Sequence, residues 1–243
     1  MQNLEFNAAA IHPIECVKEA WALIKDEYWM LFAVSIVGAL LGAVSMYVLM
    51  GAMICGIFYC YLKKIDGDRV NFEDLWIGFK YFWPSLPVVL AMVVPLVIWI
   101  IVLFVTLYLP LITMAIVGEK DNEGAILGTF LVALIIDLVI AVIMTLIHSL
   151  LIFAFPLVVD RNLSGFDAMK LSASASLKNM AGIGGLILVN FGLVLAGELA
   201  FCVGLYLVIP ILTATNLVAY RKVFPALNAQ NLNPPPPNLY QGI

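Results

Sequence analysis

Charged side chains are scarce in this sequence. Asp, Glu, Lys and Arg make up 12% of its 243 residues, against about 25% in an average soluble domain. Apolar residues make up 64%, and the mean hydropathy is +1.07. So little polar surface cannot cover a water-soluble globule of this length, which excludes a water-soluble enzyme. The net charge of −4 supplies no basic field, so we expect no nucleic acid partner.

Catalytic motifs are also missing. The sequence contains no Gly-x-x-x-x-Gly-Lys phosphate loop, no His-Glu-x-x-His, no Cys-x-x-Cys and no Gly-x-Ser-x-Gly. Two histidines, His12 and His148, are too few for a histidine metal cluster within one chain. The four cysteines lie in unrelated segments or on different helix faces, so we predict no disulfide framework. We therefore expect a protein that is not an enzyme, with no catalytic residues, no metal and no cofactor.

Long uncharged segments are what the sequence does contain. Residues 28–62 and 81–118 carry no charge, and residues 124–159 and 179–220 carry one charged residue each. One membrane crossing needs about 20 residues. Each of the four blocks is therefore long enough for one tilted helix or for a tight helical hairpin.

The positions of Lys and Arg choose between these options, because cytoplasmic loops retain basic residues. With hairpins in the first and last blocks and single passes in the middle two, eleven of the twelve basic residues fall on one side and Lys120 alone on the other. This predicts an all-α polytopic membrane helix bundle of about six transmembrane helices with interfacial amphipathic helices and both termini cytoplasmic. The expected spans are 28–45, 47–62, 84–107, 125–155, 181–197 and 201–220.

Two alternatives to this map stay open at the level of sequence. Hairpins in both middle blocks would give eight passes instead of six. Residues 108–117, which open with Tyr-Leu-Pro, either extend the third helix past a kink or lie along the outer interface. The charge pattern does not separate these possibilities, because the whole stretch is uncharged.

The map divides the chain into three parts: a cytoplasmic N-terminal segment with an amphipathic entry helix (1–27), a six-helix transmembrane domain (28–222) and a Pro/Asn-rich cytoplasmic tail (223–243). The residues before Lys18 include no Lys or Arg, so we expect no cleavable signal peptide. The tail favours an extended polyproline conformation. It is either disordered or docks on a partner, and the candidate partner-binding residues are Pro234, Pro235, Pro236, Pro237 and Tyr240.

Three polar segments, 17–29, 71–83 and 164–178, feed membrane spans and carry apolar residues at helical spacing. Asn71 and Ser164 each have an Asp three residues further on, which is the spacing of a helix N-cap. We interpret the segments as interfacial amphipathic helices. Their aromatic residues form either an ordinary interfacial belt or a platform for lipid headgroups or a partner. The candidate anchors are Trp21, Trp29, Phe72, Trp76, Phe79 and Trp83.

Asp137 is the charged residue that most needs an explanation. It falls near the middle of the fourth expected span, where an ionised carboxylate costs about 2.5–3.5 kcal/mol. His148 lies about 16 Å further along the same helix, so a proton or ion path would need water or amide side chains between them. A structural hydrogen bond to a neighbouring helix or subunit is the other interpretation. The candidate intramembrane polar site consists of Asp137, His148, Asn190 and Asn216.

Small residues at one-turn spacing favour close approach of helices. Gly38 and Gly42 form such a pair in the first expected span, and glycines recur in the fifth. The pattern leaves open whether the neighbour belongs to the same chain, although packing within the bundle is the default. The candidate packing residues are Gly38, Gly42, Gly185 and Gly192.

A family resemblance rests on the loop at residues 58–79. It has a helix end with basic residues, a Gly between acidic residues, and an aromatic-acidic-Leu-aromatic segment that ends in Gly-Phe. Matching Pro, aromatic and charged positions follow at 155–172, 178–179, 210 and 219–222. Over most of residues 15–224 the chain resembles an uncharacterised bacterial superfamily of six-helix integral membrane proteins, which includes the membrane domain of some glycerophosphoryl diester phosphodiesterases.

The resemblance implies a multi-pass protein of the bacterial cytoplasmic (inner) membrane, with six passes and cytoplasmic ends, and it implies no settled activity. Two departures matter. The connection at 108–125 looks longer than the compact one of the family. No phosphodiesterase domain is attached, so no catalytic residue is carried over.

These features together predict a non-catalytic integral membrane accessory or scaffold protein that packs against other membrane proteins or lipids. The expected partners are membrane lipids and other membrane protein subunits or a second copy in a homo-oligomer. The alternative is a small transporter or channel that uses the intramembrane Asp137. An intramembrane enzyme is a third possibility, and it would need Asp137 and His148 at one water-accessible pocket.

The six-pass map predicts that two basic loops lie on one side of the membrane. In a chain whose four native cysteines are replaced, Lys64→Cys and Lys170→Cys should both react with a membrane-impermeant maleimide in inverted vesicles and not in intact cells. Lys120→Cys should show the opposite pattern and serves as the control. Labelling of the Lys64 and Lys170 positions from opposite sides would refute the map.

Overall fold

The computed structural model describes residues 6–117, 123–199 and 203–226, and within these ranges the regular structure is helical, with no strand. A short 3-10 turn, Lys25–Glu27, joins the first two helices, and a longer 3-10 helix is labelled η2. In chain order the elements are α1 (Pro13–Ile24), α2 (Tyr28–Val44), α3 (Met50–Ile65), η2 (Phe72–Tyr81), α4 (Phe82–Val117), α5 (Glu123–Leu150), α6 (Ala154–Arg161), α7 (Gly165–Lys178), α8 (Met180–Leu199) and α9 (Val203–Val223).

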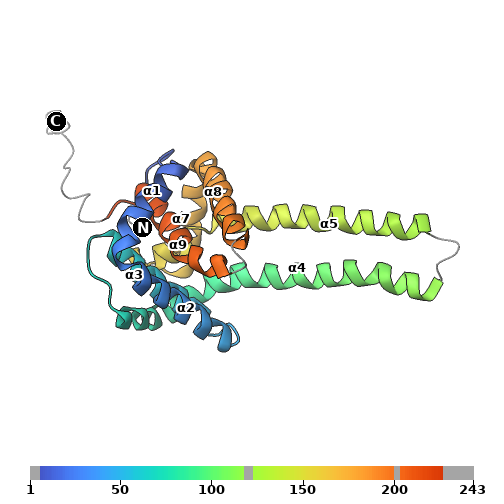
Figure 1. The fold of residues 1–243 in the computed structure, drawn as a ribbon, viewed down its shortest axis with the longest axis horizontal. Coiled ribbons are helices and arrows are strands. Elements are labelled where there is room, and N and C mark those ends of the chain that lie inside the picture. Colours follow the sequence, from blue (N-terminus) through green and yellow to red (C-terminus); the bar gives the residue numbers. More distant parts are fainter. Residues whose placement is uncertain (1–5, 118–122, 200–202, 227–243) are drawn as a thin grey trace, which may run out of the picture.

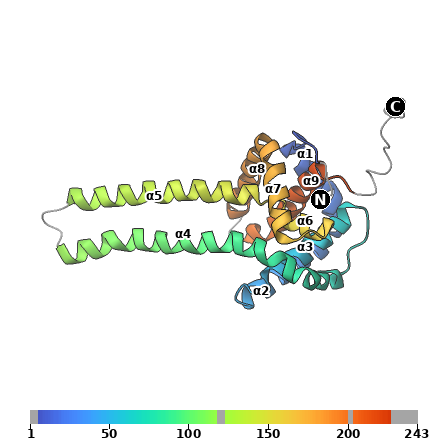
Figure 2. The ribbon, with the colours of Figure 1, turned by 180° about the vertical axis from the view of Figure 1, so that it is seen from behind.

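The molecule consists of a head and a long helical hairpin (Figures 1 and 2). The helices α4 and α5 run antiparallel and project far beyond the head, in which the other helices pack together. The head has an aromatic core, because Tyr61, Phe153, Tyr220 and Phe224 are fully buried there. The N-terminal segment closes over this core, with Asn7 N–H donating to Val223 O at 2.9 Å.

Five helical segments of the described chain are long and apolar enough to cross a membrane. They are Pro13–Val44, Phe72–Ile112, Leu127–Arg161, Met180–Leu199 and Gly204–Val223. The helix α3 is shorter, with 16 residues. The predicted all-α, multi-pass membrane character is confirmed at this level, whereas the sixth crossing and the side on which the termini lie stay predictions.

The third expected span is longer than predicted. The helix α4 runs unbroken from Phe82 to Val117, so residues 108–117 continue this helix and do not form a separate interfacial segment. Pro110 lies inside it, and the antiparallel packing of α5 along α4 supports the helix on both sides of that proline. The eight-pass alternative needs a turn within residues 82–117 and is therefore wrong.

The fourth expected span, 125–155, is too long. The helix α5 ends at Leu150, and α6 starts at Ala154 after a turn. Pro156 favours a break here, because its ring would clash with a carbonyl of a continuing helix. Ser172 from α7 stabilises the break, since its hydroxyl donates to Leu150 O at 2.7 Å and accepts from Phe153 N–H at 3.1 Å.

The second expected span, 47–62, is displaced by about one turn. The helix α3 begins at Met50, because residues 45–49 form the turn that reverses the chain after α2. Met46 and Tyr47 have φ values of 50° and 67°, in the left-handed region that a helix cannot use. The sequence map placed a turn between residues 45 and 47 but made it too short, because the turn contains no glycine or proline to mark its ends.

The helix α3 and η2 pack backbone against backbone. A Cβ atom at Gly78 would lie 2.1 Å from Ala52 O, and one at Gly56 would lie 2.1 Å from Leu75 O. No side chain fits at either position. The predicted N-cap of this segment is confirmed, because Asn71 and Asp74 form a reciprocal capping box. The loop after α3 therefore folds back and places η2 on the surface of the helix that precedes it.

This contact predicts a strong effect of one added methyl group. Gly78→Ala should destabilise the protein by about 1–3 kcal/mol, because the methyl group overlaps the backbone of α3. Gly184→Ala, at a helical glycine with no atom within 4 Å of the added carbon, should be neutral or slightly stabilising. Thermal unfolding of both purified variants in mild detergent measures the difference. Equal losses in the two variants would contradict the backbone contact.

Candidate functional site

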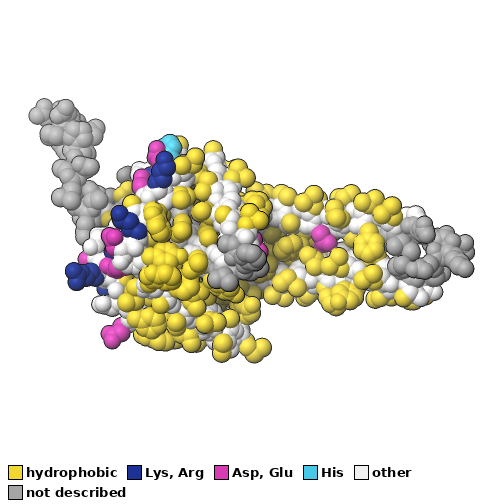
Figure 3. Space-filling view, in the orientation of Figure 1, with side chains coloured by type: hydrophobic (Ala, Val, Ile, Leu, Met, Phe, Trp, Pro, Cys, Tyr) yellow, Lys and Arg dark blue, Asp and Glu magenta, His cyan; other side chains and the backbone are white. Residues whose placement is uncertain are grey.

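Ion pairs gather at the end of the head that lies away from the hairpin tip, where the Lys and Arg side chains appear in Figure 3. Arg221 binds both carboxylate oxygens of Asp66, with Nε at 2.9 Å and Nη2 at 2.6 Å. Its Nη1 lies 2.9 Å from Asp160 Oδ2, a charge contact without hydrogen-bond geometry. Tyr220 donates to the same Asp160 oxygen at 2.6 Å. These contacts connect the ends of α3, α6 and α9.

Two lysines of the α3 end are neutralised locally. Lys64 Nζ lies 2.9 Å from Glu27 Oε1, and Lys63 Nζ lies 2.9 Å from Asp74 Oδ2. The hydrogen bond to Asp74 raises the pKa of the Lys63 ammonium above its ordinary value. Because both lysines already have carboxylate partners, this loop is not a polybasic patch for anionic lipid.

Asp137 lies between the two helices of the hairpin. The Thr106 hydroxyl of α4 is 2.9 Å from Asp137 Oδ2 and 3.0 Å from Leu103 O. The hydroxyl carries one proton, so it donates to one of these acceptors at a time. The other carboxylate oxygen, Oδ1, is buried without a hydrogen-bond partner. The polar end of Asp137 is therefore enclosed between α4 and α5, in an otherwise apolar hairpin.

The two candidate asparagines form a direct bridge between helices. Asn190 Nδ2 of α8 donates to Asn216 Oδ1 of α9 at 2.9 Å. An amide pair of this kind is a common way to join two helices in an apolar environment. The bridge satisfies one donor of Asn190, whereas its amide oxygen is buried without a hydrogen-bond partner.

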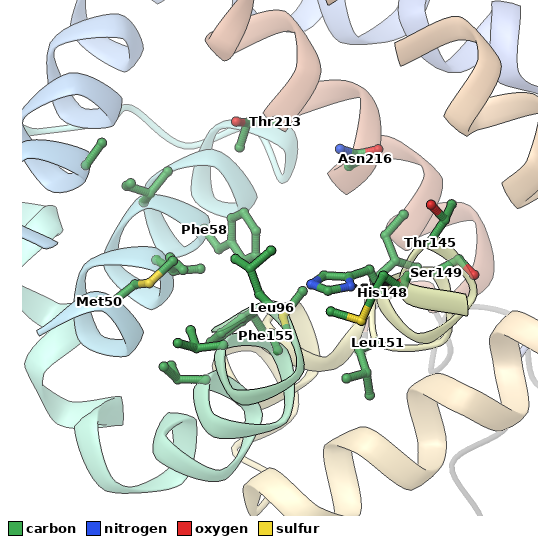
Figure 4. A pocket seen from close by; sticks show the side chains of 18 of the residues that line it. Met50, Phe58, Leu96, Thr145, His148, Ser149, Leu151, Phe155, Thr213 and Asn216 are labelled. Atoms are coloured by element: carbon green, nitrogen blue, oxygen red, sulfur yellow. Dashed lines mark hydrogen bonds between the residues drawn. The ribbon is translucent and has the colours of Figure 1, made fainter. Parts of the chain in front are cut away.

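A cavity of about 790 Å³ lies where the hairpin joins the head. Its wall comes from α2, α3, α4, α5, α6, α8 and α9 and is mainly apolar. Figure 4 shows the His148 ring pointing into it from α5, toward Leu96 and Phe58. His148 Nδ1 lies 2.8 Å from Met144 O of its own helix. The other polar residues of the wall are Ser35, Trp99, Thr145, Ser149, Thr213 and Asn216.

The structure brings only part of the predicted polar site together. His148 and Asn216 line the cavity, whereas Asp137 and Asn190 do not. An intramembrane enzyme would need Asp137 and His148 at one pocket. This cavity does not have that arrangement, because Asp137 is not among its lining residues. Sequence reasoning also missed Trp99 and Thr106. Thr106 is one of the few polar residues of α4 and so offered a signal, but a single tryptophan in an apolar run offered none.

The six predicted aromatic anchors are all exposed on the head or at the start of α4. They are Trp21, Trp29, Phe72, Trp76, Phe79 and Trp83. The entry helix α1 does more than lie at an interface, because its opposite face, Cys16, Ala20 and Ile24, is fully buried. The cysteines 16, 55 and 60 are free thiols.

The predicted packing glycines divide into three kinds. A Cβ atom at Gly38 would lie 2.8 Å from the Ile57 side chain, and one at Gly185 would lie 2.8 Å from Pro13. At Gly42 the nearest atom is at an ordinary 3.5 Å. Gly192 differs from the expectation, because no atom outside its own helix backbone comes within 4 Å and no neighbouring helix covers it.

The predicted partner-binding tail residues, Pro234, Pro235, Pro236, Pro237 and Tyr240, lie outside the described residues. Among the residues that the structure does describe, no group of three His, Cys, Asp or Glu side chains is arranged to hold a metal ion. Comparisons with protein-family models, curated proteins and solved structures found no match for this chain. The family resemblance of the sequence therefore stays a prediction.

The contact between Thr106 and Asp137 predicts that a variant with both residues replaced is more stable than the variant with Thr106 replaced alone. Thr106→Val should destabilise the protein by about 1–3 kcal/mol, because it leaves a buried carboxyl without its partner. Adding Asp137→Leu should restore most of the loss, since the unsatisfied group is then gone. Thr145→Val is the control, because Thr145 donates within its own helix to Ala141 O. Unfolding in detergent measures the unaltered chain, Thr106→Val, Asp137→Leu alone, the double variant and the control, and additive losses from the two single changes would contradict a direct pair.

Proposed function

We propose that this protein is a non-catalytic accessory subunit of the bacterial inner membrane whose hairpin packs against another membrane protein or a second copy of the chain. In this proposal six helices cross the bilayer, and both termini are cytoplasmic. The observation that carries the proposal is the length of the hairpin compared with the helices of the head.

The helices of this chain do not match one bilayer thickness. With 36 residues α4 is about 54 Å long, whereas α2, with 17 residues, is about 25 Å long. The hydrocarbon core of a bilayer is about 30 Å thick. Burying all of α4 in it would need a tilt of about 55°, beyond the usual limit of about 40°. Part of α4 therefore has a cover other than lipid, and the head supplies it at the start of the helix, where Ser85 and Val88 are buried.

On the face that Figure 3 shows, the described part of the hairpin is mainly hydrophobic, with an acidic side chain visible on it. Ile98 near the head, and Ile116 and Leu127 near the tip, are all exposed. Asp137 is the single charged residue of α5 beyond its first residue, and its carboxyl bonds to Thr106 inside the hairpin. A continuous apolar surface of this size is typical of membrane or protein contact. This exposed surface supports another membrane protein or a second copy of the chain as the partner.

A transporter or channel that uses Asp137 is the second candidate. It requires this carboxylate to face a water-filled path, and the presence of an ionisable residue near the middle of the apolar helix α5 is the observation in its favour. Against it, Asp137 bonds across the hairpin and does not line the cavity. Flux measurements in proteoliposomes distinguish the two candidates. A transporter should show a flux that Asp137→Asn abolishes, whereas an accessory protein should show no flux with either chain.

The hairpin contact can be tested with matched leucines. A photo-crosslinking amino acid at Leu127 or Leu134, both exposed on α5, should give one discrete protein adduct in native membranes. The same substitution at Leu188, which is 71% exposed on α8 in the head, should not give that adduct. Leu127→Ala with Leu134→Ala should release the partner in mild detergent, while Leu188→Ala should retain it.

Stability decides how a loss of the complex is interpreted. Exposed leucines contribute little to folding, so the hairpin variants should unfold at the same temperature as the unaltered chain. A chain that purifies as a monomer, and that gives only lipid adducts at Leu127 and Leu134, would overturn the proposal.

A further inference from the structure

The cavity at the base of the hairpin has the size and lining of a binding site. Its volume of about 790 Å³ lies within the range of roughly 300–1,000 Å³ that is usual for small-molecule sites. Among the described residues that line it there is no Asp, Glu, Lys or Arg. A ligand with a charged group would therefore leave that charge unpaired against an apolar wall, which is strongly unfavourable. The wall selects an uncharged molecule.

Most polar groups of the wall are already used within the protein. The hydroxyls of Thr145 and Ser149 donate to backbone carbonyls of α5, at 2.9 Å and 2.7 Å. The Ser35 hydroxyl contacts Leu31 O, and Asn216 Oδ1 accepts from Asn190. These four groups have partners within the protein, whereas Trp99, His148, Thr213 and the amide nitrogen of Asn216 are the other polar groups of the wall.

Trp99 and His148 retain hydrogen-bonding capacity. Trp99 Nε1 is buried without a partner, and an indole N–H is only a donor. His148 Nδ1 lies 2.8 Å from a carbonyl oxygen, Met144 O, which can only accept. In the neutral ring the proton therefore sits on Nδ1, and Nε2 is left as an acceptor. Trp99 and His148 thus offer one donor and one acceptor from two different helices.

The two groups lie at the same level of the hairpin. Thr106 on α4 faces Asp137 on α5, and the helices are antiparallel (Figure 1). Moving seven residues toward the head on each helix, about two turns, brings Trp99 opposite Met144. Met144 O is the atom that holds the His148 ring. The indole and the imidazole therefore come from neighbouring turns of the two helices, and both residues line the cavity.

We infer that this cavity binds a neutral long-chain lipid alcohol. Its hydroxyl accepts a hydrogen bond from Trp99 Nε1–H and donates one to His148 Nε2. The hydrocarbon chain lies against apolar residues that include Phe58, Leu96 and Phe155. A hydroxyl supplies both the acceptor and the donor that this pair lacks, whereas an alkane supplies neither and a carboxylate supplies no donor. The ligand enters from the hydrocarbon that surrounds the apolar helices.

The test uses the full chain in nanodiscs and three probes of equal length that carry the same diazirine: hexadecanol, hexadecanoic acid and hexadecane. Hexadecanol should label peptides of α4, α5 and α9 with at least a tenfold lower half-saturating concentration than the acid or the alkane. Trp99→Phe, which keeps an aromatic ring and removes the donor, should weaken hexadecanol labelling about tenfold. Trp83→Phe makes the same change on the same helix at a residue that is 76% exposed and does not line the cavity, so it should change nothing.

A second variant keeps the test decisive if Trp99→Phe fails to fold. Ala141 lines the cavity, so Ala141→Leu should fill part of it and reduce hexadecanol labelling without affecting the Trp99 donor. Equal labelling by all three probes would show that lipid chains merely fill the space, and would overturn the inference. So would a Trp99→Phe chain that folds and binds hexadecanol as well as the Trp83→Phe chain does.

Discussion

The contact of Arg221 with Asp66 and Asp160 is the constraint on which the head depends. Three helix ends, those of α3, α6 and α9, meet at this guanidinium, and its fork geometry fixes how they approach one another. A partly buried charge group of this kind is poorly replaced one member at a time, because the remaining partners would be left unpaired. Since the ion pairs lie at one end of the molecule, the helices can be apolar along the rest of their length.

The head and the hairpin are stabilised in different ways. In the head, backbone contacts at Gly56 and Gly78 bring α3 and η2 together more closely than side chains would allow. In the hairpin, α4 and α5 pack against each other, and Thr106 and Asp137 form a polar contact between them. Apart from the bonds that Pro87, Pro95 and Pro110 remove from α4, helical hydrogen bonds satisfy the backbone internally, which apolar surroundings require. This difference explains why a compact head carries two helices that extend well beyond it.

The cavity lies at the junction of these two parts. Its wall combines residues of the hairpin, such as Trp99 and His148, with residues of the head, such as Phe58 and Asn216. A ligand in this position contacts both parts at once. The proposed protein contact of the hairpin and the proposed lipid site are therefore neighbours in the structure, although each rests on its own observation.

The sequence by itself determined the solvent and the class of fold. Uncharged blocks of more than thirty residues demanded apolar surroundings and helices, and the N-cap at Asn71 was readable because it depends on residues three positions apart. The clustering of Lys and Arg also foretold that residues such as Lys64, Asp66 and Arg221 lie at one end of the head. These features depend on composition or on contacts local in the chain.

Only the tertiary structure decided how far the hairpin projects, that the helix ends at Leu150, and which residues line the cavity. The break depends on Ser172, which is distant in the sequence and supplies the missing hydrogen bonds. Asp137 was recognisable as unusual, but its partner Thr106 belongs to another helix. Trp99 carried no signal, because an indole that faces lipid and an indole that faces a cavity look alike in a sequence. Pairings between distant segments depend on three-dimensional packing, which periodicity and charge counts do not contain.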